Sequence, residues 1–245
     1  MKILKPTILA AGIAIASVPG CANAFTTGEF VSYTQSDWTF DAPASTLLGN
    51  NFDSIYASKG FSLDVGIGFS ISFDSPTAVQ AYIPNVPAAP GALTADELDP
   101  NAAETSSGIF GGDVTALALN VDFAAYGALH GTSITPLGDL RLTGFNPNSI
   151  FFDLDGMSVT DFLAIVETAL GGGSTDGHTL ADLDSIAAQI TGGFEDGNVS
   201  DFANEHLEGP DISATPLPGA LPLFAGGLGV VAFLARRRKS NAASI

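Results

Sequence analysis

The chain has 245 residues, 46% of them hydrophobic, with eight basic and 26 acidic residues, a net charge of −18 and one cysteine. All 26 acidic residues but only two basic ones, Lys59 and Arg141, fall within residues 25–214, which gives that segment a formal charge of −24. Such a surface repels phosphate backbones, which excludes nucleic acid as an expected partner, and the lone Cys21 excludes a disulfide within the chain.

The first 24 residues contain the three parts of a secretory signal peptide in order. Two lysines supply a basic start, residues 8–18 form a short apolar run, and the small residues Ala22 and Ala24 form a cleavage site. We therefore expect export, with cleavage after Ala24. A lipoprotein signal, with Cys21 as the lipid-bearing residue, remains an alternative.

Residues 25–145 are predicted to be rich in strands. From Phe61 to Phe73 apolar residues alternate with small and polar ones, which predicts a half-buried strand or a hairpin bent at its glycines. Ser75 and Pro76 have the positions of a cap and a first residue, which predicts a short helix over Pro76–Ile83. Further strands are predicted at Val114–Phe123 and, from weaker patterns, at Glu29–Gln35 and Asp139–Phe145.

Residues 146–207 are predicted to be helical. Each predicted helix follows an Asp-Gly pair and has a Ser, Thr or Asn cap, which makes a weak threefold repeat of about 20 residues. The predicted helices are Ser158–Leu170, Thr179–Ile190 and Asn198–Leu207. The expected fold class is therefore α+β, with an antiparallel β layer followed by a small helical cluster in one domain over residues 25–207.

The sequence predicts a membrane-spanning segment in the C-terminal part of the chain. Residues 208–216 form a linker, and no charged residue occurs in residues 217–235, which as a helix would be about 28 Å long and would span a hydrocarbon core. Residues 236–245 begin with a basic cluster that stays in the cytoplasm, so the acidic body lies outside. The cluster consists of Arg236, Arg237, Arg238 and Lys239.

A short motif precedes this apolar helix: Thr215, Pro216, Leu217, Pro218, Gly219 and Ala220. Motif, helix and basic cluster together resemble the C-terminal sorting signals of the PEP-CTERM class, in the variant that reads Val-Pro-Leu-Pro-Ala. Thr215 stands in place of the usual Val, and Gly219 is inserted before Ala220. The resemblance implies recognition by an exosortase, a membrane-embedded cysteine transpeptidase of Gram-negative bacteria that export polysaccharide. A plain single-span anchor is the alternative.

The body itself carries a second resemblance. The segments Val31–Gln35, Gly112–Val121 and Leu163–Gly173 are similar to parts of a module found in large secreted surface proteins of bacteria. That module has no assigned activity. The resemblance implies an extracellular setting and adds no catalytic residue.

The chemistry-bearing residues form no recognised catalytic or zinc-binding motif. Asp153 and Asp155 match two positions of a calcium loop, but Phe151 and Phe162 occupy positions one and twelve, where a ligand is needed. No cofactor is therefore expected, and calcium at Asp153 and Asp155 stays an open question.

These features predict a non-enzymatic structural or interaction protein of the cell surface or extracellular matrix. The expected route is Sec export, transient anchoring in the inner membrane and sorting by an exosortase, with extracellular polysaccharide as the candidate ligand. Two alternatives remain open. One is a secreted hydrolase of matrix polysaccharide, which would need a pair of carboxylates, and the other is a calcium-dependent adhesive module.

Overall fold

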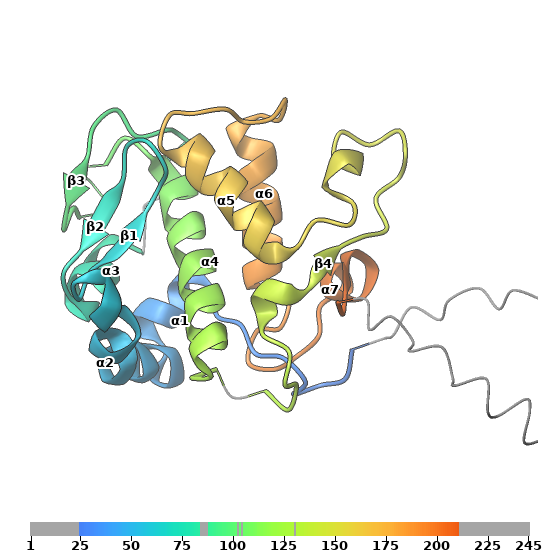
Figure 1. Ribbon diagram of the computed structural model, residues 1–245, viewed down its shortest axis with the longest axis horizontal. Coiled ribbons are helices and arrows are strands. Elements are labelled where there is room, and N and C mark those ends of the chain that lie inside the picture. The colour runs from blue at the N-terminus through green and yellow to red at the C-terminus, as the bar shows by residue number, and fades with distance from the viewer. Residues whose placement is uncertain (1–24, 84–87, 102, 104, 130, 211–245) are drawn as a thin grey trace, which may run out of the picture.

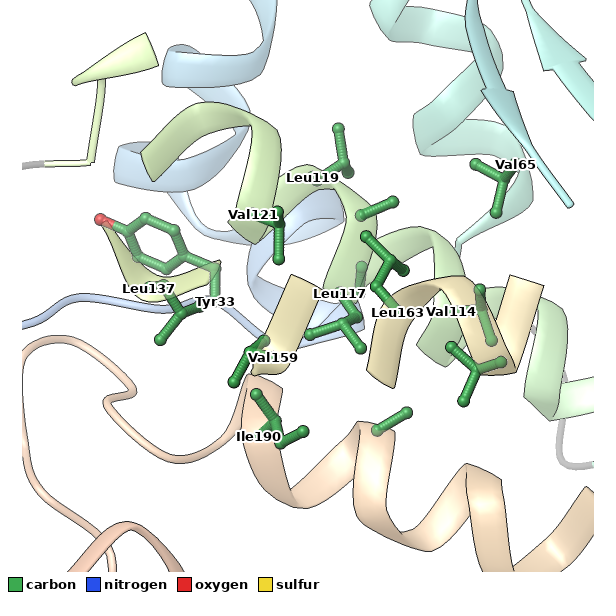
Figure 2. Packing of buried hydrophobic residues seen from close by; sticks show 14 of the residues in the cluster. Tyr33, Val65, Val114, Leu117, Leu119, Val121, Leu137, Val159, Leu163 and Ile190 are labelled. Carbon is green, nitrogen blue, oxygen red and sulfur yellow. The ribbon is translucent and has the colours of Figure 1, made fainter. Parts of the chain in front are cut away.

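A single buried helix organises the protein. The computed structural model describes residues 25–83, 88–101, 103, 105–129 and 131–210. Helix α4 (Gly108–Tyr126) runs through the middle of this body, and 14 of its 19 residues are buried. The sheet with α2 and α3 lies on one side of α4 in Figure 1, and α5 and α6 lie on the other. Figure 2 shows Leu117 of α4, Val159 of α5 and Ile190 of α6 meeting in the core.

The strand predicted at Val114–Phe123 is wrong, because these residues belong to α4. From Leu117 to Phe123 every second residue is a large apolar one, which gave the segment the period of a strand. Ala116, Ala118 and Asn120 between them are buried as well. A helix that is buried on all sides has no polar face, so its sequence lacks the period of 3.6 residues that marks a surface helix.

The N-terminal part contains helices that the sequence analysis did not predict. They are α1 (Gln35–Phe40), α2 (Ala42–Tyr56) and the short 3-10 helix η1 (Ala57–Lys59). Helix α2 buries Ala44, Leu48, Phe52 and Tyr56, which are spaced four apart and therefore line one face. The strand predicted at Glu29–Gln35 is also wrong, since this segment makes only one isolated bridge, between Ser32 and Glu195.

The hairpin predicted between Phe61 and Phe73 is confirmed. Strands β1 (Leu63–Val65) and β2 (Ile71–Phe73) pair antiparallel, and Gly66 and Gly68 in the turn have φ of 114° and 108°. Strand β3 (Glu97–Leu98) joins β2 in parallel. Helix α3 (Pro76–Tyr82) confirms the predicted short helix, and its cap Ser75 accepts a hydrogen bond from Ala78 N.

The predicted helical half is largely confirmed. It contains α5 (Val159–Leu170), α6 (Leu180–Thr191) and α7 (Asp201–His206). Their caps Ser158, Thr179 and Ser200 follow one another at intervals of 21 residues, and each side chain accepts a hydrogen bond from a backbone N–H of the first turn. The repeat is therefore one of capped helices. Helix α7 is shorter than the predicted Asn198–Leu207, because Ser200 is its cap and Leu207 belongs to a strand.

The remaining elements are short 3-10 helices and strands. Two 3-10 helices, η2 (Leu137–Asp139) and η3 (Phe152–Leu154), flank β4 (Arg141–Leu142), which pairs antiparallel with β5 (Leu207–Glu208). The predicted strand at Asp139–Phe145 is thus present only as these two residues. The fold is a mixed α+β one, as expected, but the predicted strand-rich layer over residues 25–145 is wrong, because α1 to α4 contain far more residues of that range than its short strands do.

Candidate functional site

The predicted first residue of the mature chain is built into the fold. The ring of Phe25 packs edge-on against Phe30 and Phe194, at centroid distances of 5.5 and 5.0 Å. Backbone hydrogen bonds run from this segment in two directions: Gly28 N donates to Gly197 O at 2.8 Å and Thr132 N donates to Gly28 O at 2.9 Å. The segment therefore lies between the loop after α4 and the loop after α6.

Two buried polar side chains fix this segment at its far end. Asn120 of α4 accepts a hydrogen bond from Tyr33 N at 2.8 Å and donates to Tyr33 O at 2.7 Å. Ser32 donates to Thr191 O at 2.6 Å and accepts from Phe194 N at 3.0 Å. Because both side chains are fully buried and fully paired, they define the path of the segment through the core.

The C-terminal end of the folded body lies just before the predicted linker. Leu207 in β5 is buried, and β5 pairs with β4 as far as Glu208. Both ends of the described body lie toward the same side of the molecule in Figure 1. The predicted cleavage site at Ala22 and Ala24, the sorting motif at residues 215–220 and 236–239, and the predicted membrane helix all lie outside the described residues. Within those residues, no helix is long and apolar enough to cross a membrane.

The two carboxylates considered for calcium point to different partners. Asp155 accepts a hydrogen bond from Phe145 N at 3.1 Å, whereas Asp153 lies 3.2 Å from Nε2 of the buried His178. Asp161, the next carboxylate along the chain, bonds the helix cap Ser158 at 2.6 Å. In the described part of the chain no three acidic, histidine or cysteine side chains are grouped as metal ligands. In the described structure, Asp155 and Asp161 thus make turn and cap contacts.

The aromatic residues that could have formed a sugar-binding platform are distributed through the core instead. Tyr33, Trp38, Tyr56 and Tyr82 are buried, and only Tyr126 is exposed, at 54%. Trp38 packs edge-on against Tyr33 and Phe123 at about 5 Å. Trp38 therefore fills the core between α1 and α4.

A hollow of about 320 Å³ lies between α1 and α6, with a carboxyl pair beside it. Gln35 and Phe40 of α1, Thr191 of α6 and Asp113 of α4 contribute to its walls. Asp113 is only 7% exposed, and Asp184 of α6 is close enough to it for each carboxyl group to affect the pKa of the other. Oδ1 of Asp184 is buried, and no N–H or O–H of the described residues donates to it.

The pKa values of both carboxyl groups are raised. Burial, together with the neighbouring Asp113 carboxyl, raises the pKa of Asp184 to about 7. Burial also raises the pKa of Asp113. Both carboxyl groups therefore bind a proton more readily than an exposed aspartate does.

The sequence analysis missed this pair. A signal was present, because Asp113 is the only charged residue in the apolar run from Gly108 to Val121. An acidic residue in such a run is either exposed on a bend or paired in the core. Its partner lies 71 residues further along the chain and could not be identified without the packing of α6 on α4.

Comparison of the chain with models of protein families, with curated proteins and with solved structures gave no match. Its function must therefore be argued from the geometry of the described body and from the residues at its two ends.

Proposed function

We propose that the protein is an exported surface or matrix protein whose folded body acts by structure and interaction rather than by catalysis. In this proposal the signal peptide is removed after Ala24, and an exosortase recognises the tail at residues 215–220 and 236–239. The proposed final location is the cell surface or the extracellular matrix, with extracellular polysaccharide as the proposed ligand.

The observation that carries this proposal is that the fold holds the chain beside both proposed processing signals. Phe25, the residue after the proposed signal-peptide cleavage, packs with its ring against Phe30 and Phe194. Near the other end, Glu208 is the last residue of a paired strand, seven residues before the proposed sorting motif begins at Thr215.

The use of the reactive side chains supports a structural role. Asp155 and Asp161 hold a turn and a helix cap. His206 stacks on Phe145 at 4.6 Å and contacts Thr143 O through Nδ1. Each of these groups is already engaged by the fold, which leaves the strongly acidic exterior as the feature presented to a partner.

Processing can be tested by mass spectrometry of the protein from a host with an exosortase and from one without. The expected mature chain begins at Phe25 and lacks the basic cluster Arg236–Lys239 only when the exosortase is present. Replacing Pro216 and Pro218 by Ala should retain the tail, whereas Pro210→Ala, just before the motif, should not. A mature chain that keeps the cluster in both hosts contradicts the proposal and leaves a simple anchor.

A further inference from the structure

The hollow between α1 and α6 has an aromatic ring and several hydrogen-bonding side chains in its walls. Phe40, the last residue of α1, lies on one side, and Gln35, the first residue of the same helix, lies on another. Asp113 of α4 and Thr191 of α6 supply a carboxyl and a hydroxyl group. Apolar and polar groups therefore converge on one space of about 320 Å³, at the lower end of the range of about 300 to 1,000 Å³ that ligand pockets occupy.

The exposure of Phe40 is not required by the packing of the core. The side chain is 73% exposed, and no other Phe, Tyr or Trp among the described residues is as exposed. Trp38, two residues earlier in the same helix, is fully buried. A flat apolar ring kept in water beside a hollow offers a surface on which a ligand with an apolar face can stack.

Gly112 of α4 provides the space that the amide of Gln35 occupies. A Cβ added at Gly112 would lie 2.2 Å from Oε1 of Gln35 and 2.8 Å from its Cδ, so an alanine would displace the amide. Glycine inside a helix costs about 1 kcal/mol relative to alanine, and here the missing Cβ leaves room for a group that both donates and accepts hydrogen bonds. The amide thus lies against α4 at the wall of the hollow.

The charge of the body determines which ligands the hollow can accept. Residues 25–214 carry a formal charge of −24, and Asp113 places a carboxyl group in the wall itself. Lys59 and Arg141, the only lysine and arginine of that segment, contact Asp122 and the carbonyl of Gly156 instead. A ligand with carboxylate, sulfate or phosphate groups would be repelled. The ligand that fits is uncharged.

We propose that the hollow between α1 and α6 binds a neutral pyranose unit of a polysaccharide. A pyranose has C–H groups on its faces and hydroxyl groups at its edge. In the proposed complex one face stacks on Phe40, while hydroxyl groups bond the amide of Gln35 and the carboxyl of Asp113. The inference rests on the proposed function for the class of ligand, and it adds the site and the neutral character of the sugar.

Sugar binding to the full-length protein, in a detergent without a sugar headgroup, tests the site. Calorimetric titration with hexasaccharides of glucose, galactose and mannose should show binding of at least one of them, and a hexasaccharide of galacturonic acid should not bind. Phe40→Ala should weaken binding about tenfold, because aromatic side chains contribute most to recognition surfaces. Phe152→Ala is the matched control, since this Phe is 46% exposed in η3, and should bind as the wild type does.

Gly112→Ala separates binding from folding. The added Cβ displaces the amide of Gln35, whereas alanine favours the helix, so affinity should fall while Tm changes little. If this variant does not fold, Gln35→Ala gives the same test.

Three outcomes would overturn the inference: no binding of any neutral hexasaccharide, equal binding of the acidic one, or unchanged binding in Phe40→Ala. The last outcome would still leave polysaccharide as the ligand of the proposed function, at another place on the body. Failure of exosortase processing, measured by mass spectrometry as above, would leave the binding site unaffected.

Discussion

Replacing Asn120 by Ala should be among the most damaging single changes in the protein. The substitution removes the acceptor of Tyr33 N and a donor to Tyr33 O, both in the core. Each buried backbone group left without a partner costs about 1 to 3 kcal/mol, so the expected loss is about 4 kcal/mol. For a domain of this size that corresponds to a decrease in Tm of about 8 to 16 °C.

Urea unfolding followed by circular dichroism measures this loss. Asn51→Ala is a matched control, because Asn51 also lies in a helix but its side chain bonds only Leu47 O of the same helix, at 2.9 Å. That change should cost less than about 1 kcal/mol. If the two variants lose equal stability, Asn120 does not fix the N-terminal segment. Limited proteolysis should cut the Asn120→Ala protein first within residues 25–34.

Three further results are expected. Gly111→Ala should destabilise the protein by at least about 2 kcal/mol in a melting experiment, because the added Cβ would overlap Tyr82 Oη. Gly49→Ala is the control: the space around Gly49 is open, so this change should be neutral or stabilising by up to about 1 kcal/mol. Thr179→Ala removes the cap of α6 and should cost about 1 kcal/mol. Millimolar calcium and magnesium should each raise Tm slightly and by the same amount, and the Asp153→Ala protein should show the same increase. A rise in Tm with calcium alone, absent in Asp153→Ala, would instead support the calcium-dependent adhesive module.

The helices that the sequence predicted well are those that cap themselves and face solvent. Helices α5 and α6 begin at Ser158 and Thr179 and keep a polar face, so both cap and period are visible in the sequence. Helix α2 has an equally clear period of four residues, but its cap Asp41 makes no side-chain hydrogen bond, and α2 was missed. Helix α4 has neither signal, because neighbouring elements cover it on all sides.

The carboxyl pair was unpredictable for a different reason. Periodicity and caps are local, whereas the proximity of two distant carboxyl groups depends on which helix packs against which. Asp113 and Asp184 affect each other only because α6 packs on α4. The two proposed processing signals, by contrast, are linear motifs, so their prediction does not depend on the fold.

The path of the N-terminal segment constrains when the protein can fold. Ser32 bonds Thr191 and Phe194, which follow it by 159 and 162 residues. Ser32 is synthesised early, so it cannot form these hydrogen bonds until Thr191 and Phe194 have been synthesised. Closing so long a loop is slow, and a partly synthesised chain lacks the residues that hold this segment in place. The N-terminal segment consequently reaches its final position only when nearly all of the chain has been made.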